Sequence, residues 1–183
     1  MEIFEILFLT SQARVLIFLT RHGGQAFFER EIVEATSISR SAVNLATRVL
    51  SEAGLIRRER RGKMNFYASN NQHPFVRQFK TLDTLASLEP LLKELRPLSR
   101  QIILFGSRAN GTNTHESDID LFILSQEREK VIKAISRHLA RLPIQPVIMN
   151  TQEMVESKEK DSAFHAQVKR GVVVWEANDE LGT

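Results

Sequence analysis

The chain has 183 residues, of which 42% are hydrophobic and 26% charged, with a net charge of +3 and no cysteine. This composition is ordinary for a globular protein, and it excludes disulfides, thiolate zinc sites and cysteine nucleophiles. No apolar run approaches the roughly 20 residues needed to cross a bilayer. The apolar start, Met1 to Thr10, carries two glutamates and no basic residue, which differs from a secretory signal. We therefore expect a cytoplasmic protein with no membrane partner.

Charge is distributed unevenly along the chain. Residues 1–70 carry a net charge of +3, residues 71–100 carry +2 and residues 101–183 carry −2. The positive first half predicts a polyanionic partner for that region. The slightly acidic second half suits a domain that uses a metal ion.

The first 36 residues predict two helices. Ser11 is the expected N-cap of the first one, and His22-Gly23-Gly24 indicates its end. A short second helix is expected from Glu29 to Ala35. The first helix has an apolar stripe made of Ile3, Leu7, Val15, Leu16 and Leu19.

Residues 37–54 predict a third helix, with Ser39 as N-cap and Gly54 as the left-handed residue that ends it. Val43, Ala46, Leu50 and Ala53 fall on one face of it. A β-hairpin should follow, with strands from Leu55 to Arg60 and Met64 to Ala68. The turn between them contains Gly62, at a position that favours positive φ.

Residues 73–99 predict a helical connector, because apolar residues recur there at intervals of three and four. We expect Pro90 and Pro97 to break this helix, and we place the domain boundary near residues 97–100. The apolar residues of the connector and the first helix could form a dimer surface or pack the two domains together. Those in the connector are Phe75, Phe79, Leu82, Leu85 and Leu88.

Residues 100–183 alternate between strand and helix patterns, which predicts one sheet with flanking helices. Strands are expected at 102–105, 119–124, 144–149 and 172–175. Helices are expected at 127–142 and 162–170, and Thr151 should cap a further helical stretch. The fold class is therefore α+β in two domains: a mostly helical unit with a hairpin at 1–70, the connector at 71–99 and a mixed sheet at 100–183.

Three helices followed by a two-stranded wing can read DNA, because the last helix enters the major groove and presents its N-terminal residues to the bases. The segment SRSAVNLATRVLSEAGLIRRERRGKMNFYAS resembles the recognition helix and wing of winged-helix transcriptional regulators. Seven basic and two acidic residues lie between Ser39 and Lys63. We predict double-stranded DNA as the partner and a homodimer as the binding form. The predicted contacts are Ser39, Arg40, Ser41, Asn44 and Arg48 in the helix, and Arg58, Arg60, Arg61 and Lys63 in the wing. A solvated basic hairpin, or a winged helix used for protein contacts, is the alternative.

The segment ILFGSRANGTNTHESDIDLFIL contains the residues of a second candidate site, which would bind phosphate and a metal ion. Gly106 lets the backbone approach a phosphate closely, and Ser107 offers a hydroxyl and an N–H. Asp118 and Asp120 project on the same side of a strand because side chains alternate along it. Two carboxylates that point together can hold Mg²⁺, which prefers oxygen ligands and substrate phosphates.

This segment resembles the signature of the polymerase-beta-type nucleotidyltransferase superfamily, which is Gly-Ser, about ten residues, and Asp-x-Asp. The motifs GSRANG and SDIDL are most similar to those of minimal nucleotidyltransferases, which include antitoxin partners of toxin–antitoxin pairs. The resemblance implies Asp118 and Asp120 as catalytic, Mg²⁺- or Mn²⁺-binding residues. It also implies Gly106, Ser107 and Arg108 as ligands of ATP or another nucleoside triphosphate.

Active members of the superfamily usually carry a third carboxylate on the strand that corresponds to 144–149, where this chain has Gln145. Glutamine is a poorer metal ligand and cannot act as a base at neutral pH. Whether the domain transfers a nucleotidyl group is therefore left open. We expect a DNA-binding regulator that binds NTP-Mg and transfers a nucleotidyl group, in particular AMP, to a protein or nucleic-acid acceptor. An antitoxin-type factor with a partner toxin as acceptor fits this description. The alternatives are an inactive domain that senses nucleotide or forms dimers, and a small-molecule nucleotidyltransferase.

Overall fold

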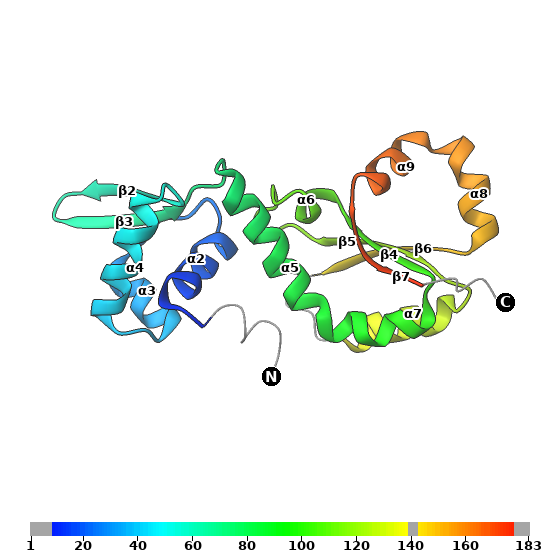
Figure 1. Cartoon of the computed structure of the whole chain (residues 1–183), viewed down its shortest axis with the longest axis horizontal. Coiled ribbons are helices and arrows are strands. Elements are labelled where there is room, and N and C mark those ends of the chain that lie inside the picture. Colours follow the sequence, from blue (N-terminus) through cyan, green and yellow to red (C-terminus); the bar gives the residue numbers. More distant parts are fainter. Residues whose placement is uncertain (1–8, 139–142, 178–183) are drawn as a thin grey trace. The chain divides into compact units, whose positions relative to one another are not determined.

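The computed structural model describes residues 9–138 and 143–177 (Figure 1). The chain divides into two compact units, one of residues 1–86 with 111–115 and the other of residues 87–110 with 116–183. Ile3 and Leu7, which were expected in the first helix, lie outside the described residues. No helix among the described residues is long and apolar enough to span a membrane.

The first unit contains three helices and a small sheet. The helices are α2 (Ser11–Arg21), α3 (Glu29–Thr36) and α4 (Arg40–Glu52). Ser39 caps α4 as predicted, since its side chain accepts a hydrogen bond from the backbone N–H of Ala42, and Gly54 follows with φ of +72°. The expected cap of α2 was wrong by one residue, because the side chain of Thr10 accepts from Ala13 and Ser11 is already helical.

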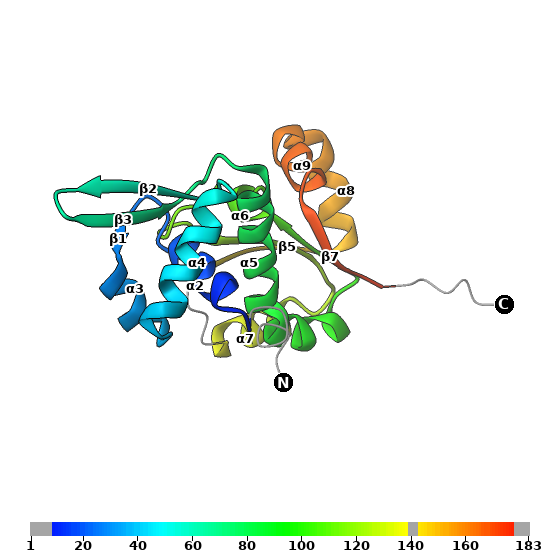
Figure 2. The same ribbon diagram turned by 60° about the vertical axis from the view of Figure 1, so that its left-hand side comes forward.

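The predicted hairpin is present as β2 (Ile56–Arg61) and β3 (Met64–Ser69). It projects from the three helices of its unit, as Figure 2 shows. A further short strand, β1 (Phe27–Phe28), pairs with β3 in an antiparallel arrangement, so the sheet has the order β1-β3-β2. The sequence analysis did not identify β1, which has only two residues.

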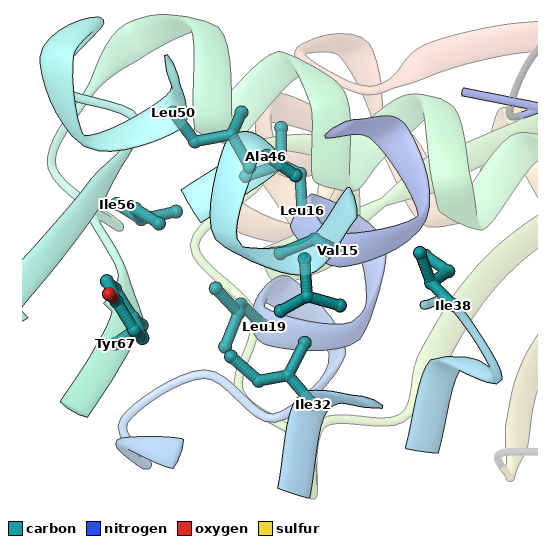
Figure 3. Packing of buried hydrophobic residues seen from close by; sticks show 10 residues of the cluster. Val15, Leu16, Leu19, Ile32, Ile38, Ala46, Leu50, Ile56 and Tyr67 are labelled. Carbon is teal, nitrogen blue, oxygen red and sulfur yellow. The ribbon is translucent and has the colours of Figure 1, made fainter. Parts of the chain in front are cut away.

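The core of the first unit lies between the three helices and the base of the hairpin. Val15 and Leu19 of α2 belong to one cluster with Ile32 of α3 and Val43 of α4, and all four are fully buried. Other members of the cluster close it against the sheet (Figure 3); they are Leu16, Ile38, Ala46, Leu50, Ile56 and Tyr67. Val43, Ala46 and Leu50 of the predicted stripe belong to this cluster, which fixes which side of α4 faces outwards. Ala53, which was expected on the same face, is the C-cap of α4 and is exposed.

The connector forms one helix, α5 (Pro74–Leu95), followed by a short 3₁₀ turn, η1 (Arg96–Leu98). The expectation that Pro90 breaks the helix was therefore wrong. Proline removes one backbone hydrogen bond, whereas the neighbouring leucines of this part of the helix, Leu88, Leu91, Leu92 and Leu95, are all buried. In the first unit, Phe79 packs near Ile17 and Ala86, while Phe75 and Leu82 are 55% and 41% exposed.

The second unit is built on a mixed sheet with the order β6-β5-β4-β7. The middle strand β4 (Gln101–Phe105) pairs antiparallel with β5 (Ile119–Leu124) and β7 (Val172–Glu176), and β6 (Ile144–Met149) runs parallel to β5. A four-residue helix, α6 (Gly106–Ala109), follows β4 directly. The sheet and its flanking helices confirm the predicted α+β class.

Helices cover both faces of this sheet (Figure 1). On one face, α8 (Thr151–Lys160) and α9 (Ser162–Lys169) contribute Met154, Phe164 and Val168 to a cluster with Ile103 and Phe122. On the other face lies α7 (Arg128–Arg137), together with the second half of α5.

Two predicted helix ends differ from the structure. Described residues of α7 end at Arg137, with His138 as C-cap, and the remainder of the predicted helix, 139–142, lies outside the described residues. Helix α8 is capped by Asn150 instead of Thr151, because Asn150 and Glu153 form a reciprocal capping box.

Candidate nucleotide site and DNA-binding surface

The candidate nucleotide site lies where β4 ends and β5 begins. Phe105 is paired with Asp120 across the two strands, so Gly106 follows directly beside this aspartate. Gly106 has φ of +71°, and a Cβ atom added to it would lie 2.1 Å from Oδ2 of Asp120. The positive φ favours glycine, and a Cβ atom at this position would require the carboxylate of Asp120 to move.

Asp118 and Asp120 flank Ile119, the first residue of β5, which is buried at 4% exposure. Because side chains alternate along a strand, the buried isoleucine leaves both aspartates on the opposite face. Burial and, secondly, the charge of Asp118 raise the pKa of Asp120, while Arg108 acts in the opposite direction. A carboxylate whose ionised form is disfavoured by burial and by a neighbouring carboxylate marks a place where a cation would be stabilised.

Arg108 lies in α6 and is 6% exposed. Its Nε donates hydrogen bonds of 3.0 Å to the carbonyl oxygens of Ser117 and Asp118, and its Nη2 donates to the Ser117 carbonyl at 2.6 Å. The guanidinium therefore holds the residues that lead into β5. Its predicted role as a nucleotide ligand stays a prediction, as do those of Gly106 and Ser107.

Gln145 lies next to the two aspartates in the described structure. It is exposed on β6, is the register partner of Asp120, and donates a hydrogen bond of 3.3 Å from Nε2 to Oδ2 of Asp118. The sequence has a glutamine where the resemblance implies a third carboxylate, and the parallel pairing of β5 and β6 brings its amide against Asp118. Gln145 occupies the position from which a third carboxylate could reach the site.

The donor set fits a magnesium ion that shares its ligands with a substrate. Asp118 and Asp120 supply carboxylate oxygens, and the missing Cβ of Gly106 leaves room beside them. Among the described residues, no group of three or more His, Cys, Asp or Glu side chains is arranged to hold a metal. A cation here would therefore take its remaining ligands from phosphates and water, as Mg²⁺ commonly does.

The candidate DNA-binding surface consists of α4 and the wing. The buried residues of α4 are Val43, Ala46, Thr47 and Leu50, so the other side of the helix is exposed. That side carries all five residues predicted for it, namely Ser39, Arg40, Ser41, Asn44 and Arg48. Ser39 is also the helix cap, and its hydroxyl lies 3.2 Å from that of Ser41.

A carboxylate that the sequence analysis missed organises part of this surface. Oε1 of Glu29 accepts hydrogen bonds from Nε of Arg40 at 2.5 Å and from Nδ2 of Asn44 at 3.2 Å. Glu29 begins α3 and precedes Arg40 by 11 positions, so only the packing of α3 against α4 brings the two together. Sequence spacing contains no signal for such a contact.

The arginines of the wing differ in whether their side chains are paired within the wing. Arg61 forms two hydrogen bonds to Glu59, at 3.0 and 2.8 Å, and its guanidinium lies 4.7 Å from the centre of the Phe66 ring. Among the described residues, the side chain of Arg58 has no hydrogen bond or ion pair, and that of Arg60 donates only to the Gly62 carbonyl. All of the predicted wing residues, Lys63 included, are exposed. The wing therefore offers positive charge to a partner.

The fold and the two surfaces define a winged-helix DNA-binding domain followed by a nucleotidyltransferase domain. Comparison with protein families agrees: the nucleotidyltransferase domain model matches residues 85–176, and the MarR family model matches residues 8–63. The chain belongs to the nucleotidyltransferase domain family, and its N-terminal part is a MarR-family winged-helix domain. A search of curated proteins returns no match.

Two solved structures show weaker similarity to the chain. One is the crystal structure, at 1.40 Å resolution, of a protein from Sulfolobus solfataricus described as a nucleotidyltransferase; it is 22% identical over 56% of this chain and 89% of the other, with a TM-score of 0.39. The other is TrmBL2, an archaeal chromatin protein described as having a novel mode of DNA binding. It is 14% identical over 85% of this chain and 70% of the other, with a TM-score of 0.32.

Proposed function

We propose that the protein is a DNA-binding regulator whose second domain binds a nucleoside triphosphate with Mg²⁺ and transfers a nucleotidyl group, in particular AMP. The observation that carries the nucleotide site is the approach of Gly106 to Asp120, which leaves no room for a side chain beside a carboxylate pair. Such an arrangement would let the backbone of the loop approach a phosphate and its cation beside the two carboxylates. Ser107, half-buried directly after Gly106, would contact the phosphates.

The proposed reaction is an in-line displacement at the α-phosphorus of the nucleotide. The oxygen of an acceptor hydroxyl forms a bond to this phosphorus, the bond to the bridging oxygen breaks, and pyrophosphate leaves. With Gln145 in place of a carboxylate, the proton of the acceptor hydroxyl passes to the leaving pyrophosphate. A Mg²⁺ ion held by Asp118 and Asp120 would neutralise charge on the phosphates during this displacement.

A second function is favoured by the Gln145–Asp118 hydrogen bond. The amide stabilises the Asp118 carboxylate without a cation, and it supplies no base. A domain with this feature could bind nucleotide as a signal and leave it unchanged. The two functions share the nucleotide site and differ in whether pyrophosphate is released.

The first domain would bind double-stranded DNA, with α4 in the major groove and the wing against the backbone. Binding to the operator of its own gene, together with a transferase that modifies a partner toxin or another protein acceptor, would make the protein an antitoxin-type factor. A homodimer would present two recognition helices to a palindromic operator. The exposed Phe75 and Leu82 of α5 and the exposed Leu9 before α2 are apolar surface suited to such pairing.

The experiment that tests the nucleotide site is calorimetric titration of the full chain with a non-hydrolysable ATP analogue and Mg²⁺. The same titration is made on the Asp118→Asn/Asp120→Asn variant. A matched control is Glu127→Gln/Glu129→Gln, which removes two exposed carboxylates from α7 and its N-cap. We expect the parent and the control to bind and the aspartate variant to lose binding.

If the aspartate variant binds the analogue as the parent does, the assignment of the site is wrong. If the parent binds, incubation with ATP labelled at the α-phosphate separates the two functions. Release of pyrophosphate with label on an acceptor supports transfer, and unchanged nucleotide supports the sensor.

A further inference from the structure

An apolar side chain lies in the middle of the donor-rich face of α4. Leu45 is one turn after Ser41 and one turn before Arg48, on the side opposite the buried Leu50, and it is 47% exposed. A leucine has nothing to offer a phosphate. In the major groove, however, the one apolar feature of a base edge is the C5-methyl group of thymine, and apolar side chains contact it.

Asn44, the residue before Leu45, is held in one orientation. An ionised carboxylate only accepts hydrogen bonds, so the Nδ2 atom of Asn44 must be the group that faces Glu29. Its Oδ1 atom and the second N–H of Nδ2 are then directed away from Glu29. An acceptor beside a donor is the pair that matches N6 and N7 of adenine.

Resting on the DNA-binding function proposed above, we propose that α4 reads an adenine and a neighbouring thymine in the major groove. Asn44 bonds N6 and N7 of the adenine, and Leu45 contacts the methyl group of the thymine. Glu29 is a positioning residue: it touches no base, and it fixes the amide of Asn44 and the guanidinium of Arg40. The protein is thereby specific for DNA that presents an adenine next to a thymine where α4 enters the major groove.

The test begins with duplexes selected from a random pool by the full chain. Each adenine of the selected site is replaced in turn by 7-deazaadenine, which lacks the N7 acceptor, and each thymine by deoxyuridine, which lacks the methyl group. Affinities are measured by fluorescence anisotropy at one salt concentration. We expect one 7-deazaadenine to weaken binding about tenfold and one deoxyuridine about three- to tenfold.

The variants assign these losses to side chains. In Asn44→Ala the 7-deazaadenine effect should vanish, and in Leu45→Ala the deoxyuridine effect should vanish. Ile132→Ala is the matched control, because it removes a similarly exposed apolar side chain (50%) from α7 in the other unit. If the 7-deazaadenine effect persists in Asn44→Ala, or the deoxyuridine effect persists in Leu45→Ala, another residue makes that contact and that part of the proposal is wrong.

The role of Glu29 is tested by the preference of the protein for the selected duplex over a scrambled one. Affinity for a single duplex is not enough, because removing a carboxylate near phosphates strengthens binding to any DNA. The ratio of affinities for the selected and a scrambled duplex should fall about tenfold in Glu29→Ala. It should be largely restored in Glu29→Gln, which keeps an acceptor for Asn44. An unchanged ratio in Glu29→Ala contradicts the positioning role.

The analogue measurements on the unaltered protein keep the proposal independent of whether a variant folds. If the protein binds the selected duplexes and no analogue changes its affinity, the A·T readout is wrong and the DNA-binding function stands. Failure to bind any duplex at low salt overturns both.

Discussion

Gly106 and Asp120 are so close that a side chain at position 106 would displace the Asp120 carboxylate of the candidate nucleotide site. A Cβ at Gly106 would lie 2.1 Å from Oδ2 of Asp120 and 3.0 Å from its Cγ. The positive φ of Gly106 adds a second requirement for glycine. The backbone conformation at Gly106 and the position of the Asp120 side chain on β5 are therefore coupled.

Gly106→Ala should displace the carboxylate of Asp120 and weaken binding of Mg²⁺ with the ATP analogue by about ten- to a hundredfold, as disturbed support of metal ligands commonly does. The left-handed backbone should also lower the free energy of unfolding by about 1–2 kcal/mol. Calorimetric titration and thermal unfolding measure the two effects.

Gly24→Ala is the matched control for this prediction. Gly24 has φ of +93°, but a Cβ there meets nothing within 4 Å, so it should lose stability and keep nucleotide binding. Equal nucleotide affinity in Gly106→Ala and the parent would contradict the packing argument.

Asp120→Asn should raise the unfolding temperature of the metal-free protein at neutral pH. Burial and the charge of Asp118 raise the pKa of Asp120 above its ordinary 3.8, so the folded protein disfavours the ionised form. Folding then takes up a proton, and stability decreases as pH rises from the ordinary value through the raised one. The gain in the asparagine variant should accordingly shrink on acidification through this range.

The same shift predicts how Mg²⁺ binding responds to pH, since the cation requires the ionised carboxylate. Affinity for Mg²⁺ in the parent should fall as pH is lowered through the raised pKa of Asp120. Thermal unfolding with and without Mg²⁺ over a pH series checks both statements. An asparagine variant less stable than the parent at neutral pH would show that the carboxylate is stabilised in the folded protein.

Gln145→Asp should increase the affinity for Mg²⁺ about tenfold, because it adds a third carboxylate beside Asp118 and replaces the hydrogen bond from the amide. Without metal, the added charge should lower the unfolding temperature. Gln145→Asn keeps an amide of the size of aspartate and serves as the control. Titration with Mg²⁺ alone measures the effect.

The outcome also separates the two proposed functions of the second domain. A sensor that has lost only its third carboxylate should gain release of pyrophosphate in Gln145→Asp, measured with α-labelled ATP. If Mg²⁺ binds no more tightly to the aspartate variant than to the asparagine variant, Gln145 does not face the cation.

Arg40→Ala and Arg61→Ala should each weaken binding to DNA, and each should reduce the slope of log affinity against log salt by about 1. Arg61 is paired with Glu59 in the free protein, at 2.8 Å. Glu59→Gln should therefore strengthen binding, because the arginine no longer has to leave an ion pair to reach a phosphate.

Arg128→Ala is the control, since Arg128 is an exposed arginine of α7 that pairs with Glu153 at 2.6 Å in the second unit. Anisotropy titrations over a salt series give the slopes. Unchanged affinity in both Arg40→Ala and Arg61→Ala would remove the assignment of α4 and the wing to DNA.

Local chemistry in the sequence was enough to predict much of this protein. Neighbouring residues were enough to predict the Ser39 cap and Gly54 end of α4, the hairpin around Gly62, and the strands and longer helices of the second unit. They did not predict the four-residue helix α6. The direction of Asp118 and Asp120 was predicted in the same way, because alternation along a strand relates residues two apart. The predicted features depend on interactions within a few residues.

Packing decided the rest. Buried leucines carry α5 through Pro90, against the local preference of proline. The meeting of Glu29 with Asn44 depends on how two helices pack, and that of Gln145 with Asp118 depends on which strands pair. Such contacts join side chains 15 and 27 positions apart. Their energy depends on how whole helices and strands are arranged, so the spacing of residues along the chain cannot predict them.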